Sequence, residues 1–495
     1  MKKNVLALSI TAALVGLGFA GGAQAIVTIG TGAAGNLALG TDGIGHMLVV
    51  PYYSAQVANS TLLSITNTDT TNGKAVKVRF RGAANSDDVY DFQVFMSPGD
   101  VWTANVSKGA DGRASLTTTD KSCTKPASVN GSFVTARLDS TLSGDALANQ
   151  TREGYVEMFN MADIPPGSAL FTAIKHVGGV PPCSGAAWTA LDTNLADLAA
   201  ANAAGLALPT TGLMGNWIII NVADAGAWSG SATPILAYQI GGVPSTGNLV
   251  YWPQTAAPVG LADAYTADPL LRGATPVVAP GMYDLPDMST PYTAGAAGNP
   301  LQQASMLSMS VATRRIINEY LTNSAINATT DWVLSSPTRR YSVALNYATG
   351  ARVYSVLTPT EFYTSANTVV LNRQICVNGS TPSYWDQEEG APTSPTAVVI
   401  SPNTPDAPIV FCGEANVLAI NNGAATVPSG TLKATVARSA LDTGSFKAGW
   451  ASFSSVGLGA GLPIMGSAFE RATAPTGTFG ATFDHRTART VNLWP

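Results

Sequence analysis

The sequence predicts an all-β protein made of antiparallel β-sandwich domains, immunoglobulin-like or jelly-roll-like, with two inserted helices. Short runs of β-branched and aromatic residues recur between residues 46 and 106, and turn-forming residues such as Asn72-Gly73 separate them. These runs are Leu48–Val50, Leu62–Ile65, Val76–Phe80, Val89–Phe95 and Val101–Trp102. Repeated short strands at this spacing are typical of a sandwich.

Residues 76–80 show the clearest alternation in the chain. Val76, Val78 and Phe80 are apolar, and Lys77 and Arg79 lie between them. Because successive side chains of a strand point to opposite faces, the apolar set is expected to face a dry interior and the basic set to face outward.

Similar runs continue to the end of the chain. We expect strands at Val134–Leu138, Tyr155–Phe159, Ala169–Ile174, Trp217–Val222, Ile235–Ile240, Leu249–Trp252, Trp332–Leu334, Tyr341–Tyr347, Thr368–Leu371, Val398–Ile400, Val417–Ile420, Leu432–Val436, Trp450–Phe453 and Thr490–Leu493.

Two segments are expected to be helical. Residues 187–207 are rich in alanine, with leucines spaced by four and three. Residues 300–322 follow Asn299, a suitable N-cap, with Pro300 at the first helical position. The expected apolar stripe of this second helix is Met309, Ala312, Ile316 and Tyr320.

The N-terminus indicates export. Residues 1–25 combine Lys2 and Lys3, an apolar run from Leu6 to Phe19, and the small-residue site Ala23-Gln24-Ala25, which together are typical of a cleavable secretory signal. We expect an N-terminal β-sandwich over 26–252, with the helical insertion near 187–207. A loop or linker over 253–299 and a helix with a C-terminal β domain over 300–495 would follow.

The chain has four cysteines. In an exported protein an even number favours disulfide bonds, and four cysteines admit three pairings. Pairing neighbours, Cys123 with Cys183 and Cys376 with Cys412, keeps each bridge within one half of the chain and is the favoured arrangement.

Composition limits the partners. Only 12% of residues are charged and the formal net charge is −5. Nucleic acid and anionic membranes are recognised through clustered Lys and Arg, so neither is expected as a partner. No membrane span is expected in the mature chain. His46, His176 and His485 stand alone in the sequence, and no nucleophile elbow or phosphate-binding loop accompanies them.

Three strands pass into similar polar ends that carry Asp69, Asp163 and Asp224. Asp and Asn at strand ends close turns by bonding their own backbone. If the three ends meet at one pole of a sandwich, their oxygens could also bind calcium, which is the one cofactor that the sequence allows for.

Carboxylates next to aromatic residues are the best candidates for contact with a ligand. Tyr384, Trp385, Asp386, Glu388 and Glu389 together are typical of a sugar-binding edge, where a flat ring stacks on a pyranose. A glycosidase would need two such acids facing one bond. A second acidic group, at residues 87–91, is expected to be a solvated turn.

Two stretches carry a resemblance to a known group. Residues 85–92 lead into residues 96–102, and later come Thr330-Asp331-Trp332-Val333 and Pro337-Thr338-Arg339-Arg340. These segments resemble poorly characterised exported cell-surface proteins of Gram-negative bacteria. The resemblance implies a secreted or cell-surface location and transfers no activity.

The function expected from these observations is that of a non-enzymatic cell-surface or extracellular structural protein, self-associating or adhesive toward surface polymers. The first alternative is a secreted carbohydrate-binding protein or glycosidase. The second is an outer-membrane β-barrel.

Overall fold

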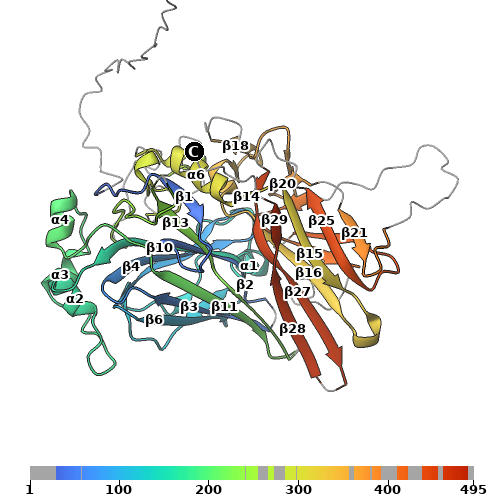
Figure 1. The fold of residues 1–495 in the computed structure, drawn as a ribbon, viewed down its shortest axis with the longest axis horizontal. Helices are drawn as coiled ribbons and strands as arrows, with labels where there is room; N and C mark the ends of the chain where they lie inside the picture. Colours follow the sequence, from blue (N-terminus) through green and yellow to red (C-terminus); the bar gives the residue numbers. More distant parts are fainter. Residues whose placement is uncertain are drawn as a thin grey trace, which may run out of the picture.

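The computed structural model describes residues 29–56, 58–223, 225–239, 241–254, 266–271, 285–296, 298–355, 362–379, 382–391, 410–421, 437–454, 461–475 and 477–488. It is mostly antiparallel β-sheet, as the sequence predicts. Two groups of strands lie side by side, one from each half of the chain (Figure 1). The expected signal segment and the strands expected at 398–400, 432–436 and 490–493 lie outside the described residues.

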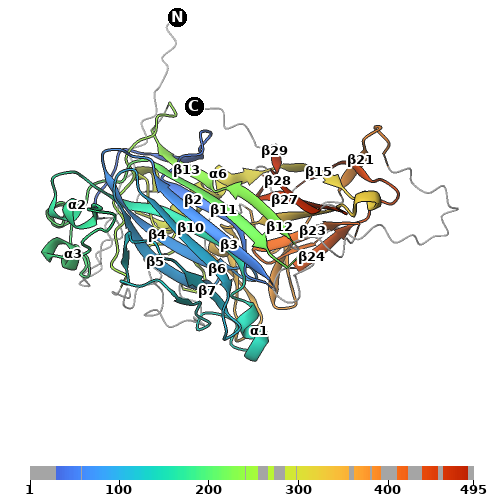
Figure 2. The same ribbon diagram turned by 90° about the horizontal axis from the view of Figure 1, so that it is seen from below.

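The N-terminal half is a sandwich of two sheets. The seven-stranded sheet contains, in spatial order, β1 (Asn36–Leu39), β13 (Thr233–Tyr238), β2 (Met47–Ser54), β10 (Glu153–Ile164), β4 (Gly73–Gly82), β5 (Asp88–Met96) and β8 (Cys123–Lys125). The six-stranded sheet contains β12 (Gly226–Ser231), β11 (Leu213–Asn221), β3 (Asn59–Asn67), β6 (Val101–Lys108), β7 (Ala114–Thr117) and β9 (Gly131–Ser132). Figure 2 shows these strands from below.

The interior between these two sheets confirms the alternation seen in the sequence. Val76, Val78 and Phe80 are fully buried in one apolar cluster with Trp102 and Trp217. Strand β4 contributes the first three, and the six-stranded sheet contributes the two indole rings. The predicted inward face of residues 76–80 is therefore one wall of a dry core.

Among its described residues, the C-terminal half adds two more main sheets and three small ones. The five-stranded sheet contains β24 (Ala437–Leu441), β23 (Ala415–Ile420), β16 (Thr329–Ser335), β27 (Met465–Ala474) and β28 (Gly477–Asp484). The four-stranded sheet contains β21 (Ser383–Asp386), β25 (Ala448–Ser454), β15 (Arg315–Leu321) and β29 (Arg486–Ala488). The small sheets pair β14 (Ala312–Thr313) with β26 (Leu462–Pro463), β17 (Val343–Leu345) with β18 (Arg352–Tyr354), and β20 (Gln374–Asn378) with β19 (Thr368–Leu371) and β22 (Val410–Cys412).

The central strands of the five-stranded sheet, β16 and β23, are buried on both faces. On β16, Trp332 points into the core shared with the four-stranded sheet, and its neighbour Val333 joins the core of the N-terminal half. On β27, Phe469 stacks on Trp217 with ring centroids 5.7 Å apart. The two halves of the chain therefore share an apolar core.

The outer face of the seven-stranded sheet is also covered, which corrects the expected exposure of Lys77 and Arg79. Both side chains are fully buried, because residues from 248–254 and 285–292 pack over this face. The Lys77 ammonium donates to Asp91 Oδ1 at 2.7 Å and to Gln254 Oε1 at 2.7 Å. Arg79 pairs with Asp88. The acidic segment 87–91 is therefore a buried partner of these basic residues and not a solvated turn.

A group of buried ion pairs, the charged junction, joins the two halves. The Arg340 guanidinium pairs with Asp87 Oδ1 at 3.0 Å and with Asp268. Arg81 Nε donates to Glu157 Oε2 at 3.3 Å, and its Nη2 donates to the Tyr341 hydroxyl at 3.3 Å. Buried charges must be paired, so these contacts fix how the C-terminal half sits on β4 and β10.

The helices differ from the sequence expectation. The segment 187–207 forms two short helices, α3 (Ala186–Ala190) and α4 (Leu198–Ala203), because Asp197 caps the start of a new helix. Residues 169–174, expected as a strand, form α2 (Ala169–Ile174), capped by Ser168. A further short helix is α1 (Gly144–Asn149), and the strands expected at 134–138 and 249–252 are not formed.

The prediction of the second helix is correct for its first half only. Helix α6 (Pro300–Val311) begins at the predicted cap, where the Asn299 side chain accepts from the Leu301 N–H. It stops at Val311, and the rest of the expected helix forms the short strand β14 and the strand β15. Ile316 and Tyr320 are four residues apart, a spacing that fits one face of a strand as well as one face of a helix.

Both favoured disulfides are formed, Cys123–Cys183 and Cys376–Cys412. The first ties β8 to the segment between α2 and α3, and the second joins β20 to β22 at directly paired positions. Within the described part of the chain, the search for a helix with the length and apolar character needed to cross a membrane finds none.

The charged junction predicts a measurable pH dependence. Burial raises the pKa of the Glu157 carboxyl to about 7, even though Arg81 and Arg79 pull it down, and Asp287 raises it further. A carboxyl whose folded pKa lies above its unfolded value stabilises the fold at low pH, and this contribution is lost as the pH rises through about 7. Glu157→Gln cannot ionise. We expect the free energy of unfolding of the wild type to fall, between pH 4 and pH 8, by about 3 kcal/mol more than that of the variant.

Urea unfolding followed by tryptophan fluorescence at several pH values measures this difference. Parallel pH profiles for the wild type and Glu157→Gln would contradict the assignment.

Candidate functional site

Strand register places an acid and two tryptophans in one row on the outer face of the four-stranded sheet. Glu319 on β15 is paired with Trp450 on β25, and Trp450 is paired with Trp385 on β21. The two indole rings stack with centroids 4.0 Å apart and planes 13° apart. Trp450 keeps 36% of its surface exposed, which is high for a residue that is usually buried.

This row lies in a cleft of about 1120 Å³. The cleft extends from the row toward β27, β28 and β29. Its walls are Ile317, Asn318, Glu319, Tyr320, Leu321, Trp385, Asp386, Gln387, Glu389, Ala448, Gly449, Trp450, Glu470, Phe483 and Arg486. We call it the aromatic–acidic cleft.

Of the five residues that the sequence predicts to contact carbohydrate, three line the cleft and two do not. Trp385, Asp386 and Glu389 line the cleft. Tyr384 lies on the opposite side of β21, where it packs edge-on against Phe446 beside the core, because neighbouring side chains of a strand alternate. Glu388 is exposed on the following turn and is not part of the cleft wall.

Local hydrogen bonds hold the rim of the cleft. Asp386 Oδ1 accepts the backbone N–H groups of Glu388 at 2.9 Å and of Gly390 at 2.6 Å, which closes the turn after β21. The Tyr320 hydroxyl donates to the backbone carbonyl of Trp385 at 2.9 Å. Trp385 is therefore held in place from the neighbouring strands, and Asp386 is used mainly as a turn former.

Two acids that the sequence did not single out also line the cleft, Glu319 and Glu470. Burial raises the pKa of Glu470 to about 7, and the negative charge of Glu319 raises it further. The two residues are far apart in the chain and meet only through the packing of β15 against β27. With Asp386 and Glu389 also present, and Arg486 as the basic residue of the wall, the cleft is acidic.

Two of the three histidines are buried and hydrogen-bonded to the backbone. Burial lowers the pKa of His46 and of His485 to about 4, so both rings are neutral at pH 7. His46 Nε2 lies 2.8 Å from the Ser245 carbonyl, and His485 Nε2 lies 2.9 Å from the Val333 carbonyl. Neither ring is among the walls of the cleft.

Two of the three aspartates proposed for calcium do meet at one pole of the N-terminal sandwich. Lys74 Nζ lies 3.2 Å from Asp69 Oδ2 and 2.8 Å from Asp163 Oδ1, so a lysine ammonium bridges the two carboxylates. Asp224 lies outside the described residues. Among the residues that are described, no group of three or more His, Cys, Asp or Glu side chains is arranged to hold a metal ion.

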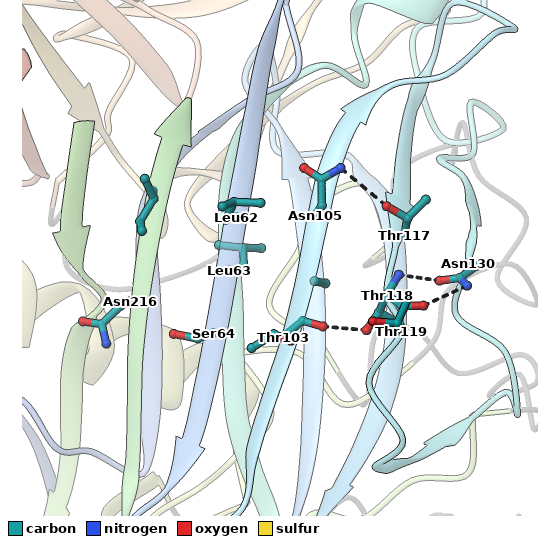
Figure 3. A pocket seen from close by; sticks show the side chains of 12 residues that line it. Leu62, Leu63, Ser64, Thr103, Asn105, Thr117, Thr118, Thr119, Asn130 and Asn216 are labelled. Carbon is teal, nitrogen blue, oxygen red and sulfur yellow. Dashed lines mark hydrogen bonds between the residues drawn. The ribbon is translucent and has the colours of Figure 1, made fainter. Parts of the chain in front are cut away.

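A second surface lies on the outer side of the six-stranded sheet (Figure 3). Its outward residues, which we call the uncharged face, contain no ionisable side chain and no aromatic ring. They are Ala227, Ser229 and Ser231 on β12, Met214, Asn216, Ile218 and Ile220 on β11, Ser60, Leu62, Ser64 and Thr66 on β3, Val101, Thr103, Asn105 and Ser107 on β6, and Ser115 and Thr117 on β7.

A groove of about 680 Å³ crosses the uncharged face, and hydrogen bonds fix its wall. The Thr118 N–H donates to Asn130 Oδ1 at 2.7 Å, and Asn130 Nδ2 donates back to the Thr118 carbonyl at 3.1 Å. The Thr118 hydroxyl donates to the Thr103 carbonyl at 2.6 Å. Figure 3 shows these contacts at one side of the groove, with Leu62 and Ser64 on its floor.

Comparison of the chain with protein-family models, with curated protein sequences and with solved structures finds no match.

The Lys74 bridge predicts the response to calcium. Because an ammonium already lies between Asp69 and Asp163, we expect the melting temperature of the wild type to be the same in millimolar calcium and in EDTA. Lys74→Met leaves two carboxylates without their shared cation, at a cost of about 3–5 kcal/mol as for other broken buried pairs.

Differential scanning calorimetry with and without calcium measures both effects. A clear rise in the wild-type melting temperature on adding calcium would contradict this interpretation of the two carboxylates.

Proposed function

We propose that this chain is an extracellular or cell-surface protein that binds saccharide chains in the aromatic–acidic cleft. The observation that carries the proposal is the exposed Trp450–Trp385 stack inside a cleft with carboxylates. The two disulfide bonds support an oxidising, non-cytoplasmic compartment.

The aromatic pair supports the saccharide as ligand. A pyranose has one flat face of C–H groups, which packs well on an aromatic ring. Trp450 offers such a ring, and its stack on Trp385 fixes the ring in place before a ligand arrives. Preorganised aromatic contacts bind at low cost in side-chain entropy.

The carboxylates of the cleft support hydrogen bonding to the hydroxyl groups of a sugar. An ionised carboxylate accepts hydrogen bonds, and sugar hydroxyls donate them. Glu and Asp outnumber Arg486 in the cleft wall, so the cleft disfavours anionic ligands, because like charges repel. Neutral or cationic saccharides fit the cleft, and polyuronates do not.

A second candidate function is glycoside hydrolysis, favoured by the presence of Glu470 and Glu319 in one cleft, where the charge of Glu319 acts on Glu470. A general acid must keep its proton near neutral pH, and the pKa of Glu470, raised to about 7, meets that requirement. Glu319 would then be the second carboxylate.

Binding to a neutral β-glucan, to chitosan and to polygalacturonate tests the proposed function. We expect binding to the first or second polymer and markedly weaker binding to the third. Trp450→Ala should weaken the binding about tenfold, equivalent to about 1.4 kcal/mol of lost ring contact. Isothermal titration calorimetry with oligosaccharides of the bound polymer measures the change.

Trp188→Ala is the matched control, because Trp188 also keeps part of its surface exposed but lies on α3, away from the cleft. Equal binding by Trp450→Ala and the wild type, or no binding to any of the three polymers, would count against the proposal.

Release of reducing ends from the bound polymer distinguishes the second candidate. If the cleft is catalytic, hydrolysis should decline as the pH rises above about 7, because Glu470 loses its proton there. Glu470→Gln should then abolish hydrolysis and keep binding. A saccharide that is bound and left intact at every pH excludes turnover of that saccharide.

A further inference from the structure

The aromatic–acidic cleft contains a half-buried carboxylate that the protein leaves without a cation. This carboxylate belongs to Glu470 on β27. Within the described part of the chain, no hydrogen bond or ion pair reaches it or the carboxylate of Glu319. The charged junction shows the opposite arrangement, since Asp87 and Glu157 each face an arginine. A carboxylate that loses water without gaining a cation is unfavourable in its ionised form.

The surroundings of Glu470 do not compensate its charge. Burial raises the pKa of Glu470 to about 7, and the negative charge of Glu319 raises it further. Arg486 also lines the cleft, but its Nη1 donates to the backbone carbonyl two residues before it at 3.2 Å. The strand positions paired with Glu470 are Ala481 and Thr330, which carry no charge. Two carboxylates of the described cleft wall thus act on each other with no protein cation between them.

An aromatic ring lies next to the second of these acids. Strands β21, β25 and β15 are neighbours in this order, and Trp385, Trp450 and Glu319 occupy one row across them. Trp385 covers one face of the Trp450 ring, so the free face of that ring is turned toward the strand of Glu319. Directly opposite residues of an antiparallel pair have Cβ atoms about 5 Å apart. A cation on the free face of Trp450 is therefore within reach of the Glu319 carboxylate.

These features together suit an ammonium group. A cation is attracted to the face of an indole ring, and an ammonium also donates hydrogen bonds to carboxylates. A neutral sugar would gain the ring contact but would leave the repulsion between Glu319 and Glu470 unrelieved. An amino sugar gains both, because its ring packs on the indole and its ammonium lies among the acids.

We propose that the ligand of the aromatic–acidic cleft is an amino sugar in its cationic form, with the ammonium held by Glu319, Glu470 and the free face of Trp450. This inference rests on the proposed function, and it narrows the ligand from saccharides in general to those that carry a positive charge. Asp386 and Glu389, which also line the cleft, add to its negative potential.

Three β-1,4-linked oligomers of equal length test the charge of the ligand, because they share their ring and linkage and differ at C2. They are oligomers of glucose, of N-acetylglucosamine and of glucosamine, and only the last is cationic. We expect isothermal titration calorimetry near pH 6.5 to give an affinity for the glucosamine oligomer at least about tenfold higher than for the other two. The difference should shrink at high salt, which screens charge.

Glu319→Gln and Glu470→Gln keep the size of the side chain and remove its charge. Each should weaken binding of the glucosamine oligomer about tenfold, the cost of one hydrogen bond to a charged group, and should weaken binding of the neutral oligomers much less. Glu388→Gln is the matched control, since Glu388 is exposed on the adjacent turn and is not part of the cleft wall.

Proton release gives a second, independent measurement. A bound ammonium favours the ionised form of Glu470, so binding near pH 7 should expel part of its proton. Titrations in buffers with different enthalpies of ionisation count the protons released. The wild type should release about half a proton more per ligand than Glu470→Gln does, because the amine of the ligand titrates equally in both experiments.

Separate results distinguish this inference from the proposed function. Equal affinity for the glucose and glucosamine oligomers would overturn the cationic ligand and leave the saccharide cleft standing. A preference for glucosamine that Glu319→Gln and Glu470→Gln leave intact would do the same. Binding of an oligolysine peptide as tightly as the glucosamine oligomer would replace the sugar with a cationic peptide and overturn both proposals, as would the absence of binding to any of the three oligomers.

Discussion

The pairing of buried charges on the outer face of the seven-stranded sheet is the constraint on which the rest of the structure depends. Arg79, Arg81 and Lys77 leave β4 on the side away from the apolar core, and all three are shielded from water. A guanidinium in such a place is tolerated only when carboxylates surround it. Asp87, Asp88 and Glu157 meet this requirement from the same sheet, and Arg340 extends the network to the other half of the chain.

The segments that carry the sequence resemblance take part in this network. Asn85 and Asp87, from the first stretch, both contact Arg340, from the last. The Tyr155 hydroxyl donates to the carbonyl of Pro337 in the same stretch at 3.1 Å. Buried ion pairs and hydrogen bonds thus join these segments, which are far apart in the chain.

The sequence predicted those features that depend on local pattern. Alternation located β4 and its inward face, and proximity along the chain gave the disulfide pairing. Alternation could not show what covers the other side of β4, because the covering side chains come from residues 249–251, 288, 292 and 341, far away in the chain. For the same reason, the aromatic and acidic residues at 384–389 indicated only one wall of the cleft. Glu319 and Glu470 join it only through strand register and sheet packing.

The five-stranded sheet gives a last consequence, which concerns how far the chain can be divided. Its strands belong to the C-terminal half of the chain, yet Val333, Val417 and Phe469 on these strands pack in the core of the N-terminal half. A fragment ending near residue 254 would lose one wall of its interior, and the complementary fragment would present those side chains to water. The two sandwiches have separate sheet topologies but share one apolar core. Neither of them is therefore expected to fold stably without the other.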